Sequence, residues 1–180
     1  MMAQALAHLR VIDLGVHISA SYCTKLLADL GADVVKVEWG DGDPLRRTGT
    51  FPNDPHDPTV GGLFGYLNTN KRTIMVDLKG KKAVDAVLSL AAQADLIVEN
   101  LGPGVLERMG IGFDHLRTAN PRIALVRISD FGQNGPDAGI AATDFTVQAA
   151  GGWISKHFAG LPDPIQVGGN LADYVSAAYA

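Results

Sequence analysis

The sequence has 180 residues, of which 47% are hydrophobic and 19% charged, a composition typical of a folded domain rather than a disordered chain. The formal net charge of −4 argues against a general nucleic-acid-binding or membrane-surface protein, because such proteins usually present a basic face. A single cysteine, Cys23, excludes an intramolecular disulfide and a cysteine-cluster zinc site, and we expect it to be a small core residue.

Short apolar runs alternate with helical patterns along the chain. Strands are predicted at 10–14, 33–38, 73–78, 95–99, 122–128 and 164–167, and helices at 23–30, 84–91 and 171–180. Continuous apolar strands separated by amphipathic helices indicate an α/β fold, with a Rossmann-like parallel sheet and helices on both faces. In such sheets ligands bind beyond the carboxyl ends of the strands, so we expect the chemistry in the loops 15–21, 39–60, 99–105 and 129–142.

Several familiar sites are disfavoured. The loop from Gly15 to Ser21 lacks the G-x-G-x-x-G pattern of dinucleotide binding, and no Walker lysine loop supports phosphoryl transfer. The histidines are scattered without metal-ligand spacing, so we predict no metal site. Among them His17 follows a strand, where a solvated residue and a ligand contact are equally good interpretations. Residues 1–9 lack the pattern of a secretory signal, and no apolar run is long enough to span a bilayer, so we expect a cytoplasmic protein.

Two groups of residues have both a structural and a functional interpretation. Basic residues flank the third predicted strand, where they either form solvated ends or bind a phosphorylated ligand: Lys71, Arg72, Lys79, Lys81 and Lys82. After the fourth strand, Asn100 precedes a Gly-Pro-Gly turn and a short helix that presents Arg108. A polar amide and a guanidinium beside a rigid turn favour ligand recognition.

Asp173 lies three residues after Asn170, the predicted N-cap of the last helix. At that position the positive helix end favours the ionised carboxylate. The residues alone favour a helix-capping role, while a nucleophilic carboxylate next to glycines is the functional alternative.

The chain resembles the class III coenzyme A (CoA) transferase family, which includes formyl-CoA and carnitine-CoA transferases and the α-methylacyl-CoA racemases. The resemblance rests on ordered blocks over nearly the whole chain: 11–14, 26–38, 68–78, 98–110, 131–136, and Asp144 with Gln148, Gly151 and Gly152. It implies a CoA-transferase that moves CoA between an acyl-CoA donor and a carboxylic acid, with no permanently bound cofactor. It also implies that Asp173 is the nucleophile and forms a covalent aspartyl intermediate, with Asp144 as a second catalytic position.

The resemblance further implies CoA contacts at His17, Ile18, Ser19, Val76, Lys79, Asn100, Leu101 and Arg108. Three positions depart from the family pattern: Ser19-Ala20-Ser21 stands for Ala-Gly-Pro, Trp39 for a basic residue, and Thr143 for the histidine of the racemases. The missing histidine favours a transferase over a racemase-like isomerase. A non-catalytic CoA-binding fragment is the other alternative.

Family members are usually more than twice this length, with a second small domain and an interlocked homodimer. We therefore expect residues 1–180 to be the N-terminal part of the large CoA-binding α/β domain, without the small domain. The helical pattern that reaches Ala180 without a stop signal led to the same expectation of a fragment.

Overall fold

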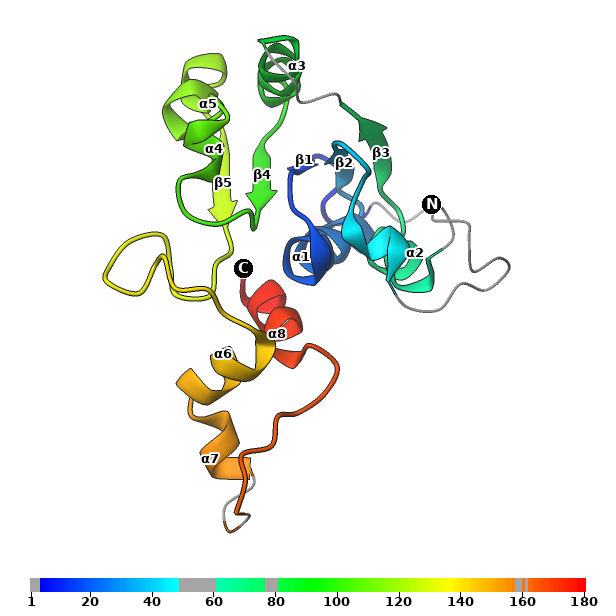
Figure 1. The fold of residues 1–180 in the computed structure, drawn as a ribbon. Helices are drawn as coiled ribbons and strands as arrows, with labels where there is room; N and C mark the ends of the chain where they lie inside the picture. Colours follow the sequence, from blue (N-terminus) through cyan, green and yellow to red (C-terminus); the bar gives the residue numbers. More distant parts are fainter. Residues whose placement is uncertain (1–3, 49–60, 77–80, 158–159, 161) are drawn as a thin grey trace.

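The centre of the fold is a parallel sheet of five strands, seen in a computed structural model that describes residues 4–48, 61–76, 81–157, 160 and 162–180. The strands run in the order β3-β2-β1-β4-β5 (Figure 1). Their bounds are β1 Arg10–Asp13, β2 Asp33–Glu38, β3 Arg72–Met75, β4 Leu96–Glu99 and β5 Ala124–Arg127. The predicted parallel α/β architecture is confirmed.

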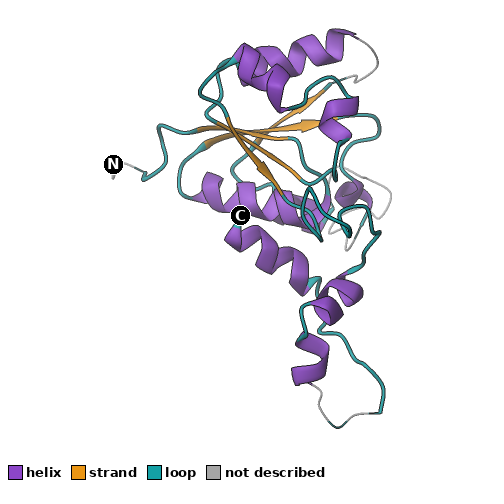
Figure 2. Cartoon of the chain, turned by 90° about the vertical axis from the view of Figure 1, so that its left-hand side faces the viewer, coloured by secondary structure: helices purple, strands orange, loops and turns teal. Residues whose placement is uncertain are grey.

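Helices cover both faces of this sheet (Figure 2). Helices α1 and α8 pack together on one face, and α3, α4 and α5 lie over the other. The short helices α6 and α7 form an arm that projects away from the sheet before the chain returns through α8 (Figure 1). The helix bounds are α1 His17–Asp29, η1 (a 3₁₀ helix) Pro44–Arg47, α2 Gly62–Leu67, α3 Lys81–Ala91, α4 Val105–Arg108, α5 Phe113–Ala119, α6 Asp144–Ala150, α7 Trp153–His157 and α8 Leu171–Tyr179.

Alternate residues of each strand divide the core into two layers, because successive side chains of a strand point to opposite faces. Val11 and Val98 face α1 and α8, where Cys23 is 6% exposed and belongs to the same cluster. Ile12 and Ile97, which are in register, face α3 and α5. Cys23 is therefore the small core residue that the sequence predicted.

The strand order puts a change of direction between β1 and β4. The chain builds outward from β1 through β2 to β3 and then returns to the other side of β1 for β4 and β5. At such a point the loops leave in opposite directions and open a crevice beyond the carboxyl ends of the strands. Gly15, Asn100 and Asp130 follow β1, β4 and β5, so these three loops meet at the crevice.

Two predicted elements are wrong. The expected loop 15–21 is largely helical, because α1 begins at His17, where the backbone enters the helix through a positive φ of 57°. The expected strand 164–167 is not a strand, because the N–H and C=O of Val167 bond to the side chain of Gln148 instead of to a neighbouring strand. Within the described residues, no helix has the length and apolar character required to span a bilayer.

Candidate active site

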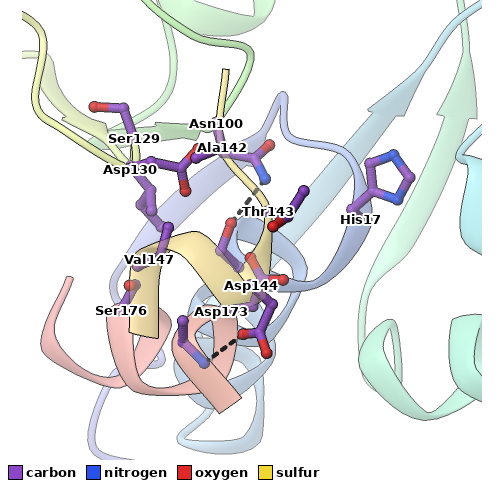
Figure 3. A pocket seen from close by; sticks show the side chains of 13 residues that line it. His17, Asn100, Ser129, Asp130, Ala142, Thr143, Asp144, Val147, Asp173 and Ser176 are labelled. Atoms are coloured by element: carbon purple, nitrogen blue, oxygen red, sulfur yellow. Dashed lines mark hydrogen bonds between the residues drawn. The ribbon is translucent and has the colours of Figure 1, made fainter. Parts of the chain in front are cut away.

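Two joined clefts open at the crevice between β1, β4 and β5. We call the first the acidic cleft, because Asp130, Asp144 and Asp173 lie in its wall. Figure 3 shows Asn100 and Asp130 on the sheet side of this cleft, with Asp144 and Asp173 on the side of α6 and α8. The lining residues are His17, Ser19, Asn100, Ile128, Ser129, Asp130, Ala142, Thr143, Asp144, Val147, Ala172, Asp173 and Ser176.

The second, or loop, cleft lies between the turn after β4 and the segment 131–142. It shares Asn100 and Asp130 with the acidic cleft and adds Leu101 and the exposed Arg108. Gly104, which has a φ of 71°, precedes α4, and a Cβ there would lie 3.0 Å from a guanidinium nitrogen of Arg108. The glycine therefore allows Arg108 to fold back over the turn.

Asp173 is held over the start of α1 by the packing of α8. The rings of Tyr22 and Tyr174 meet edge to face with their centroids 4.9 Å apart, and Ala177 is 2% exposed against the sheet face. Asn170, the residue before α8, has a φ of 56° and makes no side-chain cap. The helix start was predicted at the right residue, but Asn170 does not cap it.

Asp144 provides the missing cap. Its Oδ1 accepts a hydrogen bond from the backbone N–H of Ala172 at 2.8 Å, and its Oδ2 accepts from the side chain of Gln148 at 2.6 Å. Gln148 also bonds to both backbone groups of Val167. Both carboxylate oxygens of Asp144 thus position the first turn of α8, which carries Asp173.

Asn100 ties the end of β4 to the turn between β1 and α1. Its Oδ1 accepts from the Val16 N–H at 2.9 Å, while its Nδ2 donates to the Val16 carbonyl at 2.7 Å and to the Ser19 hydroxyl at 2.8 Å. Both amide protons of Asn100 are therefore engaged. The side chain shapes the site and has no free donor for a ligand.

His17 begins α1 in a backbone region that non-glycine residues rarely adopt, which costs on the order of 1–3 kcal/mol. The Asp43 carboxylate accepts a hydrogen bond from the His17 N–H at 3.2 Å and helps to hold this conformation. The imidazole is exposed and lines the acidic cleft.

Burial is the largest effect on Asp173 and raises the pKa of its carboxyl group above the usual value. The charges of Asp144 and Asp130 raise this pKa further, while His17 and a hydrogen bond from Ser19 lower it by less. The sequence argument considered only the helix end, which favours the ionised form, whereas burial and the neighbouring acids give a net rise in this pKa.

A buried charge cluster lies directly beneath the site. It consists of Asp13, Lys36, Asp43 and Lys71, whose charged groups are enclosed. Lys36 Nζ lies 2.9 Å from Asp43 Oδ2, outside hydrogen-bond geometry, and donates to the Gly15 carbonyl at 3.0 Å. Lys71 Nζ lies 3.0 Å from Asp13 Oδ2.

The two lysines of this cluster respond differently to their surroundings. Burial lowers the pKa of Lys71 to about 8, although the Asp13 charge opposes that shift. Burial also disfavours the charged form of Lys36, but Asp13 and Asp43 outweigh it and raise the pKa of Lys36. Burial raises the pKa of Asp13, and the charges of Lys36 and Lys71 reverse this to a net lowering. The cluster is a balanced ionic core that supports the turn at Gly15.

Comparison with known families shows to which family the chain belongs. The model of CoA-transferase family III matches residues 6–180. The chain belongs to CoA-transferase family III. The segments that build both clefts lie inside the matched range.

Three family relatives are named as CoA-transferases of carboxylic acids. The chain is 37% identical to succinyl-CoA:mesaconate CoA-transferase of Haloarcula hispanica, covering 96% of this chain and 45% of that protein. It is 35% identical to succinyl-CoA–D-citramalate CoA-transferase of Chloroflexus aurantiacus, with 95% and 42% covered. It is 37% identical to formyl-CoA:oxalate CoA-transferase of Streptomyces coelicolor, with 96% and 41% covered.

Solved structures of similar proteins share the fold. A CAIB/BAIF family protein from Brucella suis superposes with a TM-score of 0.90 at 30% identity, over 99% of this chain and 47% of that one. A hypothetical protein from Mycobacterium tuberculosis gives 0.84 at 30% identity, over 98% and 48%. The chain thus spans less than half the length of each of these similar proteins.

The structure brings most of the predicted site residues of this family III chain to the two clefts. Five of them line the acidic cleft: His17, Ser19, Asn100, Asp144 and Asp173. Two more, Leu101 and Arg108, line the loop cleft together with Asn100. Strand ends that were far apart in the sequence therefore meet as expected.

Two predicted contacts do not lie in these clefts, and a third falls outside the residues that the structure describes. The Ile18 side chain is 6% exposed and packs in an apolar cluster with Leu45, Phe64 and Leu67. Val76 packs against the α3 and α5 layer beside β3, which β2 and β1 separate from β4. Lys79 lies outside the described residues.

The two basic residues at the start of β3 have partners within the protein. The ammonium group of Lys71 is buried against Asp13 and is therefore closed to an anionic ligand. Arg72 is exposed and forms a two-pronged ion pair with Asp33.

Sequence reasoning missed Asp130 and Asp43 as residues of the site. Asp130 lies three residues after β5 and within the predicted loop 129–142, so an acidic side chain soon after a predicted strand was the available signal. Asp43 lies in the predicted loop 39–60, but its contact with His17 joins segments 26 residues apart and has no local sequence signal. Among the described residues, no three carboxylate, histidine or cysteine side chains are grouped so as to hold a metal ion.

Proposed function

We propose that this chain is part of an enzyme that transfers CoA between an acyl-CoA donor and a carboxylic acid, with Asp173 as the nucleophile. The observation that carries the proposal is the partly exposed Asp173 carboxylate in a cleft at the carboxyl edge of the sheet. Family membership and the names of the relatives support the reaction class.

Covalent catalysis divides the exchange into four balanced steps. The Asp173 carboxylate attacks the thioester carbonyl, the C–S bond breaks, and a mixed anhydride and CoA thiolate form. The thiolate attacks the aspartyl carbonyl and releases the donor acid, leaving an aspartyl-CoA thioester. The acceptor carboxylate attacks this thioester and displaces the thiolate, giving a second anhydride. The thiolate then attacks the acceptor carbonyl and regenerates Asp173.

The loop cleft is the proposed place for part of the CoA moiety. Arg108 is exposed there, and a guanidinium can pair with phosphate oxygens. The cleft continues through Asn100 into the acidic cleft, so a thioester could extend from Arg108 toward Asp173.

The observed role of Thr143 favours a transferase over a racemase. Its hydroxyl accepts from the Thr146 N–H and caps α6, and the side chain carries no base that could remove an α-proton. We further propose a cytoplasmic homodimer for the full-length protein, on the family resemblance.

Trapping the intermediate tests the proposal. The full-length protein is incubated with acyl-CoA and hydroxylamine, which converts an activated aspartyl group into a hydroxamate, and is then digested for mass spectrometry. We expect the modification on the peptide that contains Asp173, dependent on acyl-CoA. Modification confined to another carboxylate, or none during turnover, would contradict the nucleophile assignment.

Removing a neighbouring charge is expected to extend activity to lower pH. In Asp130→Asn the carboxylate that raises the pKa of Asp173 is gone, so Asp173 ionises at lower pH. We expect kcat/KM on the acid side of the pH profile to rise about 2- to 5-fold, a modest effect because Asp130 is exposed to solvent. Asp137→Asn, which removes an exposed charge from the same segment outside both clefts, should leave the profile unchanged. If the pH profiles of kcat/KM for Asp130→Asn and the wild type are the same, Asp130 does not influence the ionisation of Asp173.

A further inference from the structure

The side chain of Gln148 connects α6 to the segment that leads into α8. Gln148 is 3% exposed, and its Nε2 donates to the Val167 carbonyl at 2.9 Å and to Asp144 Oδ2 at 2.6 Å. Its Oε1 accepts from the Val167 N–H at 2.9 Å. These partners fix the orientation of the amide, because the reversed amide would direct its oxygen at two acceptors and its nitrogen at a donor. Both amide protons of this buried group are therefore used within the protein.

The segment 162–170, through which the chain returns from the arm to α8, has little packing of its own (Figure 1). The structure describes all of these residues, and every one except Val167 is exposed. The Gln148 amide pairs with both backbone groups of Val167, as a neighbouring strand would. Because these two bonds join residues 19 positions apart, they close the base of the arm and hold the return segment against α6.

The other amide proton of Gln148 orients Asp144 toward the start of α8. With Oδ2 of Asp144 held by Gln148, its Oδ1 accepts from the Ala172 N–H at 2.8 Å. This N–H belongs to the first turn, whose donors have no partner inside the helix, and Asn170 provides no side-chain cap. Ala172 directly precedes Asp173, so a continuous set of hydrogen bonds runs from Gln148 to the backbone next to the proposed nucleophile.

We propose that Gln148 is a positioning residue for CoA transfer, which acts through Val167 and Asp144 to fix the first turn of α8 and hold the Asp173 carboxylate at the acidic cleft. The inference rests on the proposed function, because it concerns the placement of the proposed nucleophile. Gln148 itself lines neither cleft, so its effect on the reaction passes through the residues that it holds. A displacement of a reacting group by about 1 Å can lower the rate about a hundredfold.

The test combines amide hydrogen exchange with steady-state kinetics of the full-length protein. Gln148→Met removes the amide and keeps most of the side-chain volume. We expect exchange at the Val167 and Ala172 amides to become roughly tenfold faster, because the first loses its acceptor and the second an acceptor that Gln148 orients. The kcat for CoA transfer should fall about 10- to 100-fold, while KM for acyl-CoA stays within about twofold because the loop cleft keeps its residues. Gln93→Met, the same change at an exposed glutamine after α3, is the matched control and should leave all three quantities unchanged.

Unchanged exchange at both amides, or a wild-type kcat in folded Gln148→Met, would overturn the positioning role, since a residue that only stabilises the fold leaves the turnover of the folded enzyme intact. If Gln148→Met does not fold, Gln148→Asn decides the question, because its amide is one methylene shorter and cannot reach Val167 and Asp144 together. A lower kcat at a retained KM in Gln148→Asn supports the role, and a wild-type kcat overturns it.

The proposed function is tested separately by Asp173→Asn. Transfer by a folded Asp173→Asn variant would remove the proposed function. An inactive Asp173→Asn variant, together with a wild-type kcat in the folded Gln148 variant, would remove the positioning role alone.

Discussion

Replacing Asp173 by asparagine in the full-length protein is expected to lower kcat for CoA transfer by at least about a thousandfold. The amide cannot form the mixed anhydride, so the exchange loses its covalent route. The measurement is the rate of new acyl-CoA formation at saturating donor and acceptor. Asp114→Asn provides a matched control, because Asp114 is an exposed aspartate in the first turn of α5, outside both clefts.

The same substitution is expected to leave the fold intact or make it slightly more stable near neutral pH. The pKa of Asp173 is raised in the folded protein, so ionising this group disfavours folding above its unfolded-state pKa, and a neutral amide removes that cost. Urea unfolding at pH 7 measures the change. Unfolding of the Asp173→Asn variant would contradict the predicted effect on stability. CoA transfer by a folded Asp173→Asn variant would contradict the assignment of Asp173 as the nucleophile.

The second large effect is expected in the buried charge cluster. Lys36→Met should lower the free energy of unfolding by about 3–5 kcal/mol, because Asp43, 2% exposed, would keep its charge without a cation at 2.9 Å. Methionine preserves most of the lysine volume, so the loss reports the charge rather than a cavity. The variant is measured by urea denaturation of the full-length protein.

An exposed lysine and a double variant separate charge from other causes. Lys82→Met, in an exposed position of α3, should change stability by less than about 0.5 kcal/mol. Adding Asp43→Asn to Lys36→Met removes the unpaired charge and should restore part of the loss. A cost below about 1 kcal/mol for Lys36→Met, or no restoration in the double variant, would show that the pair is not the source of stability.

The layered fold was predictable because its strands are apolar on both faces. The predicted range 33–38 matches β2, the ranges 10–14 and 95–99 each extend beyond their strands by one residue, and 122–128 extends beyond β5 by three. The loops after β1, β4 and β5 could be singled out for the same reason, since parallel strands bring their carboxyl ends to one edge. Asn100 was singled out in this way, Asp173 by its place at a helix start, and Asp144 through the family resemblance alone.

What the sequence could not predict depends on contacts between distant segments. The α1 start at His17 needs Asn100 and Asp43 to hold its backbone, and neither is a neighbour in the sequence. From the sequence, Lys71 is expected to be a surface cation. In the structure the pairing of β3 with β2 places it against Asp13. The raised pKa of Asp173 likewise comes from burial in the folded chain and from the charges of Asp144 and Asp130, which are at least 29 residues away in the sequence.

The position of Lys36 has a consequence for anyone who wishes to redesign this protein. Its ammonium group bonds to the Gly15 carbonyl and the Ser21 hydroxyl, so one buried residue joins the ionic core to the turn and helix start that carry His17 and Ser19. Substitution of Lys36 is therefore expected to lower the stability of the fold before it changes the activity. If the loop cleft holds CoA as proposed, libraries that alter this binding belong in the segment 131–142, which includes residues that line the cleft and takes no part in the ionic core.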